Sequence, residues 1–374
     1  MRGVWVSAAT CALLGAACEL PARTGWDERS PVAIRERSVK IAAPAEPSRL
    51  RILAWNIKFG AGRIDFWFDF WGDRAQMTPG EVTANMEGIY ALLREVDADV
   101  ALISEIEVGS RRSAYYDMVA GILENAGMNY AAFFPNWESR YVPSEGVGRL
   151  EMGNAIFSRY PIAFAERIAQ AEREDLSPER WYFYLHRNIG RTVLDLGARQ
   201  VAAYVVHTEA YDRDRTKSTH LQQILEELRG EQLRFVVGGD FNAIPPNAAR
   251  VEGFPDEHPS SLGTEFENPP YVLTDMEPFF AEFVPAIPLE RIGATEASQR
   301  RYYTHSVIGP ATLGTDGQPG FWNRTLDYLF VRAPDAWDPS TTDVLQARGD
   351  SGIQGDPLLL SDHAPVVGTW VLAP

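Results

Sequence analysis

Polar side chains suited to phosphate chemistry stand at the ends of six apolar runs in this chain. The most informative is the segment Asp362-His363-Ala364-Pro365, close to the C-terminus. A carboxylate beside an imidazole can hold a metal ion and polarise a phosphate. The other five segments are Leu53-Ala-Trp-Asn56, Ile103-Ser-Glu105, Val205-Val-His207, Val236-Val-Gly-Gly-Asp240-Phe-Asn242 and Thr325-Leu-Asp327.

Three of these side chains suit a hard divalent cation. Cleavage of a phosphodiester needs an activated water, charge neutralised around phosphorus, and a leaving oxygen that is protonated or bound to a metal. Glu105 and Asp362 can provide carboxylates, and Asn56 can add an amide oxygen. Oxygen ligands of this kind suit Mg²⁺ or Mn²⁺, and Mg²⁺ keeps several waters, so three protein ligands suffice. The sequence therefore predicts a site for Mg²⁺ or Mn²⁺.

Each segment also has an interpretation without chemistry. Asn56 could cap a turn after its strand, and Asp240 with Asn242 could form only an Asx turn. Asp327 and His363 could be an ordinary ion pair. Glu105 is harder to explain this way, because an unpaired buried carboxylate at the end of an apolar run is costly. The occurrence of all six segments in one chain favours function.

Strand-like and helical patterns alternate irregularly between these segments. Runs such as 51–56, 99–106, 201–207 and 235–240 predict buried strands that each deliver a polar side chain to a sheet edge. Thr78-Pro-Gly-Glu81 has the form of a capping box with proline at the first helical position, and it predicts a helix that follows. Because strands and helices do not strictly alternate, we expect sheets packed on each other with helices outside.

The ordered series resembles the endonuclease/exonuclease/phosphatase family of Mg²⁺-dependent phosphoesterases, from about residue 50 to the C-terminus. Gly239-Asp-Phe-Asn242 and Ser361-Asp-His-Ala-Pro365 carry the resemblance as an ordered pair, and residues 153–161 are similar to the family's mid-chain strand. The resemblance implies an α/β fold, a four-layered α/β/β/α sandwich of two packed mixed β-sheets flanked by helices. The site would lie at one end of the sheets.

The same resemblance implies roles for the site residues. Asp240 would orient or deprotonate the attacking water, and Asn242 would hold that water or a phosphate oxygen. His363 would contact the phosphate or take part in proton transfer. Asp327 would orient His363, and His207 would be a second imidazole near the phosphate. Arg191 aligns loosely with a phosphate-contacting arginine of the DNase branch, and a solvated arginine is the alternative.

These roles describe a metal-dependent phosphoester hydrolase, and the substrate is a separate question. Nucleic acid is the leading hypothesis, through the resemblance to exported nucleases. Phospholipid or inositol phosphate is the alternative, which the aromatic insertion Phe66-Trp-Phe-Asp-Phe-Trp71 supports if it forms a hydrophobic lip. Packing of that insertion beneath a loop is the other interpretation. A catalytically inactive binding module would have lost at least one catalytic residue, and none is missing.

Composition limits the partners of the chain. Its 374 residues are 45% hydrophobic and 23% charged, which is ordinary for a globular protein, and the spread of the motifs predicts one domain over residues 49–374. The formal net charge of −16 disfavours a protein that coats nucleic acid tightly and non-specifically. A nuclease is not excluded, because a bound divalent cation supplies local positive charge.

The N-terminal residues have the layout of an export signal. Residues 1–18 have a basic start and an apolar stretch, and they contain both cysteines, Cys11 and Cys18. Cys18 resembles the lipid-attachment cysteine of bacterial lipoproteins, with simple cleavage or a retained anchor as alternatives. Residues 19–48 are rich in Pro, Ala, Arg and Glu and predict a flexible tether. We therefore expect an exported protein, periplasmic or extracellular, that Cys18 could hold at a membrane.

Overall fold

Two seven-stranded β-sheets form the centre of the protein. The structure is a computed structural model that describes residues 22–211 and 213–374. The order in the first sheet is β13 (Ala336–Val344), β14 (Val366–Val371), β3 (Arg49–Asn56), β4 (Val100–Glu107), β6 (Gly148–Ser158), β5 (Tyr130–Val142) and β2 (Ile34–Glu36). The order in the second sheet is β1 (Arg29–Pro31), β7 (Ile162–Ala169), β8 (Asn188–Asp195), β9 (Gln200–His207), β10 (Arg234–Asp240), β12 (Asp327–Val331) and β11 (Val284–Pro285).

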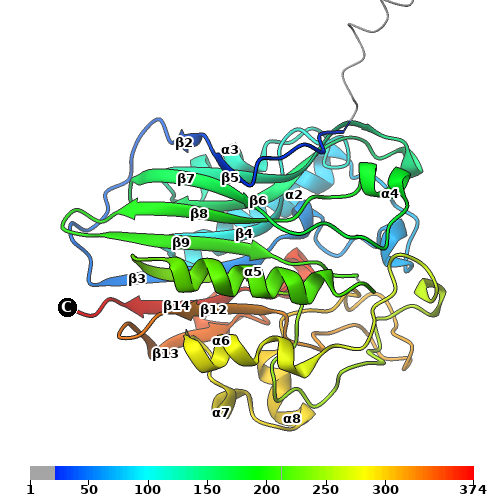
Figure 1. The fold of residues 1–374 in the computed structure, drawn as a ribbon. Helices are drawn as coiled ribbons and strands as arrows, with labels where there is room; N and C mark the ends of the chain where they lie inside the picture. The colour runs from blue at the N-terminus through cyan, green and yellow to red at the C-terminus, as the bar shows by residue number, and fades with distance from the viewer. Residues whose placement is uncertain (1–21, 212) are drawn as a thin grey trace, which may run out of the picture.

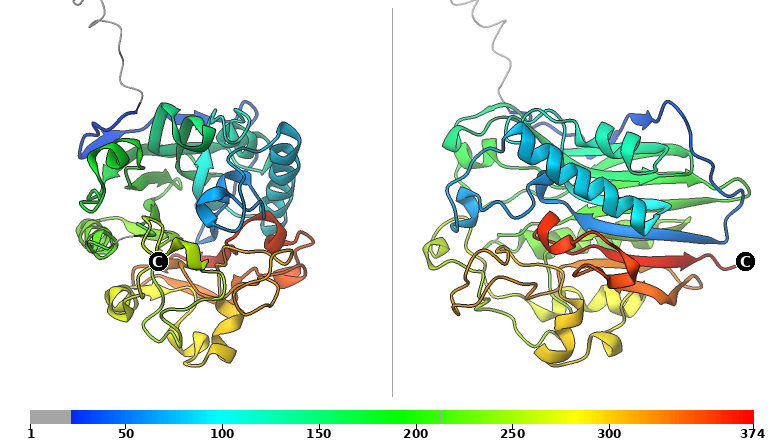
Figure 2. Two further views of the ribbon diagram at one scale, coloured as in Figure 1. Left: turned by 90° about the vertical axis from the view of Figure 1, so that its right-hand side faces the viewer. Right: turned by 180° about the vertical axis from the view of Figure 1, so that it is seen from behind.

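Helices cover the two outer faces of this pair of sheets. Figure 1 shows α5 (Thr216–Gly230) in front of the second sheet, and the right-hand view of Figure 2 shows α2 (Pro79–Val96) on the opposite side of the molecule. The shorter helices are α3 (Met118–Asn125), α4 (Pro178–Phe183), α6 (Glu277–Glu282), α7 (Leu289–Ile292), α8 (Glu296–Gln299) and α9 (Pro357–Leu360). The predicted α/β/β/α sandwich is confirmed.

Alternation along the strands divides the apolar residues among three cores. In β3, Leu53 and Trp55 belong to the core beneath α2 and α3, whereas Ile52 and Ala54 belong to the core between the sheets. A third core lies between the second sheet and helices α5 and α6. Because successive side chains of a strand point to opposite faces, a strand buried on both faces is apolar throughout. This accounts for the uninterrupted apolar runs.

Helix α2 begins where the sequence predicts it. The Thr78 side chain accepts a hydrogen bond from the Glu81 backbone N–H at 3.3 Å, and the Glu81 carboxylate accepts one from the Thr78 backbone N–H at 2.7 Å. This reciprocal pair satisfies two backbone donors that have no partner within the helix. The capping box therefore sets the start of the helix that covers the first sheet.

The polar strand ends lie at one end of the sandwich because of the strand directions. β3 runs parallel to β4, and β9 runs parallel to β10, so each pair ends on the same side. β12 is antiparallel to β10, so its first residue, Asp327, lies directly opposite Asp240. On the other side of β10, Asp240 is in register with His207. The topology alone thus places three of the predicted catalytic residues in one row.

The N-terminal segment differs from the expected flexible tether where it is described. β1 pairs with β7 of the second sheet, and β2 pairs with β5 of the first. The Arg29 guanidinium also binds the carboxylates of Glu166 and Glu227, at 2.8 and 2.9 Å. Short backbone ladders and ion pairs therefore hold this segment on the domain, despite its lack of apolar periodicity. The predicted leader, residues 1–18 with Cys18, lies outside the described residues.

The aromatic insertion packs beneath the long loop of residues 247–270. The Trp67 ring meets Phe266 edge to face at a centroid distance of 5.7 Å, and Trp71 meets His258 at 4.8 Å. The Trp71 indole also donates to the Asp256 carbonyl at 2.9 Å. The packing interpretation thus describes much of the insertion. Across residues 22–211 and 213–374, no helix combines the length and the apolar character needed to span a membrane.

Candidate active site

Asp240 lies at the centre of the predicted site. Its Oδ2 accepts a hydrogen bond from Asn56 Nδ2 at 3.2 Å, and Asn56 Nδ2 also donates to Glu105 Oε1 at 3.0 Å. His207 Nε2 and His363 Nε2 lie 3.4 and 3.6 Å from Asp240 Oδ2. Side chains from the ends of β3 and β9 and from the segment before β14 therefore surround one carboxylate.

A glycine lets Asp240 approach its neighbour this closely. Gly239 has φ 138°, a conformation that side-chain-bearing residues rarely adopt, and a Cβ there would lie 2.1 Å from the Val206 carbonyl oxygen. Only a residue without a side chain fits against the adjacent strand at this position. Gly239 thus allows β10 to deliver Asp240 beside His207.

A strained backbone directs Glu105 into the site. Glu105 has φ 54°, in the left-handed region, at an irregularity of the β4–β6 pairing between Ile103 and Ile106. A non-glycine residue in this region costs on the order of 1 kcal/mol. The bulge turns Glu105 out of the alternation of β4, and its side chain retains 23% exposure. Bulges commonly re-aim a side chain beside an active site.

Asp327 and His363 form a buried pair. His363 Nδ1 lies 2.7 Å from Asp327 Oδ2, and both side chains are at most 5% exposed. Burial disfavours the imidazolium, but the carboxylates of Asp327 and Asp240 more than offset this and raise the pKa of His363 to about 10. His363 is therefore a cation at neutral pH. Because Asp327 holds its Nδ1–H, its Nε2–H is directed at Asp240 and the centre of the site.

His207, unlike His363, is an uncharged imidazole. Burial lowers its pKa well below the ordinary value, and the nearby cations Arg187 and His363 lower it further. His207 is therefore neutral, and its Nδ1 has no hydrogen-bond partner. The site thus holds one charged and one neutral imidazole on either side of Asp240.

Asn242 forms with Asp240 the Asx turn that sequence analysis predicted as one alternative. Its backbone N–H donates to Asp240 Oδ1 at 2.9 Å, which is the hydrogen bond of an Asx turn. Its own side-chain Nδ2 donates to the Thr208 carbonyl at 3.1 Å. The turn occupies Oδ1 of Asp240 and leaves Oδ2 facing the site. The Asx turn therefore orients the catalytic carboxylate and does not replace its function.

Asp362 is joined to a lysine that sequence analysis missed. Lys58 Nζ lies 3.5 Å from Asp362 Oδ2 and 3.0 Å from Asp69 Oδ2, and the Lys58 side chain is 2% exposed. Lys58 and Asp69 come from the segment after Asn56 and from the aromatic insertion. A buried lysine needs a carboxylate partner, so the position of Lys58 after an apolar run was a usable signal. Nothing in the sequence identifies Asp69 as that partner.

The chemistry of the carboxylates fits a divalent cation. Burial raises the pKa of Asp240 to about 6, and burial with the nearby Asp362 raises that of Glu105. A bound cation would remove this penalty by neutralising the carboxylates. Glu105 and Asp362 offer hard oxygen atoms, as Mg²⁺ or Mn²⁺ prefers. The predicted third ligand, Asn56, is corrected by the structure, because its Oδ1 accepts a hydrogen bond from the Lys58 backbone N–H at 3.0 Å while its Nδ2 faces Glu105. The ligand atoms of His305, Asp362 and His363 all lie within 4.8 Å of one another, and so do those of Asp240, Asp327 and His363.

His305 belongs to the site although no motif marks it. Its ring lies 4.4 Å from the His363 ring between centroids, and its Nδ1 has no hydrogen-bond partner. His305 and His363 are also joined by an isolated backbone bridge. The sequence offered no signal here, because only the antiparallel bridge between two distant loops brings these imidazoles together.

Arg187, four residues before Arg191, is the arginine that reaches the site. Arg187 is 5% exposed and lines the same cavity as Glu105, Asp240 and His363. Its Nε and Nη1 have no hydrogen-bond partner, and its Nε lies 3.7 Å from Glu209 Oε2. A guanidinium on the wall of this cavity is suited to an anion such as phosphate.

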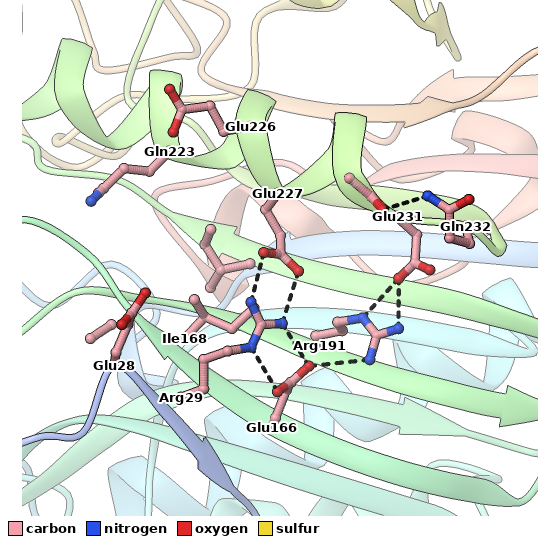
Figure 3. A pocket seen from close by; sticks show the side chains of 13 residues that line it. Glu28, Arg29, Glu166, Ile168, Arg191, Gln223, Glu226, Glu227, Glu231 and Gln232 are labelled. Atoms are coloured by element: carbon pink, nitrogen blue, oxygen red, sulfur yellow. Dashed lines mark hydrogen bonds and ion pairs between the residues drawn. The ribbon is translucent and has the colours of Figure 1, made fainter.

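Arg191, the arginine proposed from the sequence, lies elsewhere. Figure 3 shows it on the outer face of the second sheet beside α5, between Glu166 and Glu231. Its Nη1 lies 3.2 Å from Glu166 and its Nη2 lies 2.7 Å from Glu231. Arg191 does not line the catalytic cavity, so the structure corrects the predicted phosphate contact. The expectation failed because Arg191 sits in the middle of β8 and not at its end.

Comparisons with known proteins agree with this architecture. The family model described as Endonuclease/Exonuclease/phosphatase family matches residues 53–363. An endonuclease/exonuclease/phosphatase structure from Beutenbergia cavernae DSM 12333 is 17% identical, with a TM-score of 0.51, and covers 87% of this chain and 72% of its own. One from Bacteroides vulgatus is 13% identical, with a TM-score of 0.50, and covers 87% of this chain and 99% of its own. No curated protein matches the chain.

Proposed function

The chain belongs to the endonuclease/exonuclease/phosphatase family, and on that premise we propose that it is a metal-dependent hydrolase that cleaves phosphodiester bonds by in-line attack of water. The observation that carries this proposal is the cluster around Asp240, in which Asn56, His207 and His363 all approach Oδ2. These donors orient the carboxylate, and burial raises the pKa of Asp240 to about 6, so that it is suited to accept a proton from water.

Glu105 and Asp362 would hold the metal ion, and Asn56 would orient Glu105 through the hydrogen bond from its Nδ2. When bound, Mg²⁺ or Mn²⁺ neutralises charge on the phosphoryl oxygens and lowers the pKa of a bound water. Lys58 balances part of the negative charge of Asp362 from the opposite side, because its Nζ lies 3.5 Å from that carboxylate. A site that keeps open positions for water and phosphate suits these few ligands.

The remaining residues bind phosphate and move protons. Asp240 orients the attacking water and accepts its proton, with Oδ1 fixed by the Asn242 N–H. His363, charged and held by Asp327, donates Nε2–H to a phosphoryl oxygen, and neutral His207 offers a second N–H. Arg187 adds a positively charged guanidinium on the wall of the same cavity. As the bond from the water oxygen to phosphorus forms, the bond from phosphorus to the leaving oxygen breaks.

Hydrolysis of bis(p-nitrophenyl) phosphate tests this proposal. We expect turnover with Mg²⁺, loss of turnover with EDTA, and a decrease of about 100-fold or more in kcat for Asp240→Asn, because general base catalysis contributes about 10² to 10⁴. A catalytically inactive binding module would give equal, background rates in all three cases, and that outcome would reject the enzyme.

Export and membrane attachment form a separate part of the proposal. They are supported by the leader-like composition of residues 1–18 and by Cys18. Mass spectrometry of the mature N-terminus after expression with the native leader tests both. A lipid-modified Cys18 would support attachment, whereas an unmodified terminus further along the chain would reject it but support export.

A further inference from the structure

The cavity that contains the catalytic residues extends into an apolar chamber. The cavity has a volume of about 470 Å³. On one side it is lined by Glu105, Asp240 and His363. Away from them, its lining includes the residues that we call the apolar chamber, which are Trp137, Val142, Val147, Leu150, Met152 and Leu185.

The apolar chamber is not part of the cores that hold the sandwich together. Val142, Val147, Leu150 and Met152 form a cluster of their own, separate from the cores between the four layers. Val142 ends β5, Leu150 and Met152 belong to β6, and Val147 lies in the connection between these two strands. Small satellite clusters usually lie beneath loops, but this one opens onto the cavity that holds Asp240. An apolar wall continuous with a phosphate site is suited to an apolar part of the same ligand.

Aromatic side chains line the cavity as well. Trp67 and Phe68 of the aromatic insertion, Phe183 of α4 and Phe266 of the long loop all line it. Trp67 and Phe266 hold each other edge to face at 5.7 Å. The insertion therefore contributes to the cavity wall in addition to its packing beneath the loop. Aromatic rings bury large apolar areas against a ligand.

The cations around this cavity are all compensated by acidic side chains. Lys58 pairs with Asp69 at 3.0 Å, Arg112 with Glu107, Arg180 with Glu265 at 3.1 Å, Arg187 with Glu209 at 3.7 Å, and Arg324 with Asp256 at 3.0 Å. A polynucleotide carries a phosphate at every step and needs a track of uncompensated lysines and arginines. The net charge of −16 provides no overall excess of positive charge to attract a polyanion either. These charges fit one phosphate next to a neutral group better than a polyanion.

We propose that the substrate is a phosphoester with an aliphatic or aromatic group on its phosphate, and that the apolar chamber binds this group while the Asp240 cluster binds the phosphate. This inference rests on the proposed hydrolase function. The cavity volume of about 470 Å³ lies within the range of pockets that hold drug-sized ligands, about 300 to 1,000 Å³. The structure thus favours an apolar ester over nucleic acid, the leading hypothesis from the sequence.

Val147 is the best position for a test. It lies directly after a short 3₁₀ turn, outside the strands of the sheet, and is 5% exposed. A substitution there changes the wall of the chamber without removing a ladder hydrogen bond of β5 or β6. Val147→Thr keeps the shape and adds a hydroxyl, whereas Val147→Trp fills the chamber. Val39→Thr, at a position that is 76% exposed, is the matched control.

The experiment uses methyl, butyl, octyl and phenyl p-nitrophenyl phosphodiesters with Mg²⁺, so that the leaving group stays the same. We expect kcat/KM to increase along the alkyl series by up to about fourfold per buried methylene, which is the factor for transfer of one CH₂ group from water. The phenyl ester distinguishes an aromatic occupant from an aliphatic one. Phosphatidylcholine vesicles test whether the aliphatic group is that of a lipid.

The Val147 variants test whether the apolar chamber causes the preference for longer alkyl esters. Val147→Thr should lower the ratio of kcat/KM for the octyl ester to that for the methyl ester by about fourfold, and Val147→Trp should lower this ratio by about tenfold or more. Val39→Thr should leave the ratio unchanged. If Val147→Trp does not fold, the Val147→Thr result decides the matter alone.

Failure of this inference can be told apart from failure of the proposed function. Equal kcat/KM along the series, or faster cleavage of a single-stranded oligonucleotide than of the octyl and phenyl esters, would overturn the apolar substrate while leaving the hydrolase intact. Absence of Mg²⁺-dependent cleavage of every ester, the methyl ester included, would instead reject the hydrolase on which the inference rests.

Discussion

His363 Nδ1 and Asp327 Oδ2 are 2.7 Å apart in a pair that is closed to solvent on both sides. Asp327 is the first residue of β12 and His363 lies just before β14, so both stand at the same end of the molecule as Asp240. This pair fixes both the orientation and the charge of the imidazole, because the carboxylate holds the Nδ1 proton and stabilises the imidazolium.

Because of this pair, we expect the stability of the metal-free protein to decrease at alkaline pH. The pKa of His363 is raised from 6.5 to about 10. The contribution of the imidazolium to the free energy of unfolding is therefore complete below pH 6.5 and is lost as pH rises through about 10. That contribution is on the order of 3 kcal/mol. Urea unfolding in EDTA should show this loss between pH 7 and 10 for the wild type and a smaller loss for Asp327→Asn, in which Asp240 still stabilises the imidazolium. Parallel pH profiles for the two proteins would contradict the assignment.

Substitution of Asp327 should also impair catalysis. Asp327→Asn keeps the size of the side chain but no longer stabilises the imidazolium, so we expect kcat to fall by about 100-fold, with a smaller change in KM. Steady-state hydrolysis of bis(p-nitrophenyl) phosphate checks this. A change in KM alone would indicate that His363 only binds substrate.

Removal of Glu105 should abolish stabilisation by the metal. At about 100 times its dissociation constant, a ligand of the folded state stabilises it by about 2.7 kcal/mol. Mg²⁺ should therefore raise the melting temperature of the wild type but not that of Glu105→Gln. Glu252→Gln, at an exposed position, is the control and should respond as the wild type does. An equal Mg²⁺ response in Glu105→Gln would remove Glu105 from the ligand set.

Lys58 should be more important for stability than any surface lysine. Lys58→Met leaves Asp69 and Asp362 buried without their shared partner, and loss of one member of a buried pair costs about 3 to 5 kcal/mol. The double variant with Asp69→Asn should recover part of this loss. Lys40→Met, which removes an exposed ion pair with Glu36, should cost less than about 1 kcal/mol. Urea unfolding of all four proteins tests this ranking.

Arg187 and Arg191 form a natural pair of test positions. We expect Arg187→Ala to lower kcat/KM by about 100-fold, as for loss of one donor to a transition-state oxygen. Arg187→Lys should restore only part of it, because lysine lacks the planar fork. Arg191→Ala should leave kcat/KM within about twofold, as for a substitution away from the site. A large effect of Arg191→Ala would contradict the assignment of phosphate binding to Arg187.

The sequence was sufficient to predict the residues around Asp240. Asn56, His207 and Asp240 each end an apolar run, and buried strands bring their polar ends to one edge of a sheet. The Asp327–His363 pair was implied by the resemblance of two motifs. The four-layered sandwich was likewise implied by that resemblance, and the apolar runs of strands buried on both faces agree with it.

The residues that were missed depend on contacts between segments without periodic patterns. Lys58 and Asp69 meet through the aromatic insertion, and His305 reaches His363 through a single backbone bridge. Neither contact leaves a spacing that can be recognised along the chain. The pairing of β1 with β7 and of β2 with β5 was also missed. Each of these two strands has only three residues, and the composition of the surrounding segment resembles a tether.

Arg187 and Arg191 illustrate what the sequence determined and what only the tertiary structure determined. The sequence by itself determined which side chains end the strands, because burial on both faces requires uninterrupted apolar runs before them. It could not determine which arginine faces the phosphate site, since four residues of extended chain span about 13 Å. Only the packing of the two sheets placed Arg187 in the cavity, left Arg191 on the outer face, and built an apolar chamber beside the catalytic carboxylates.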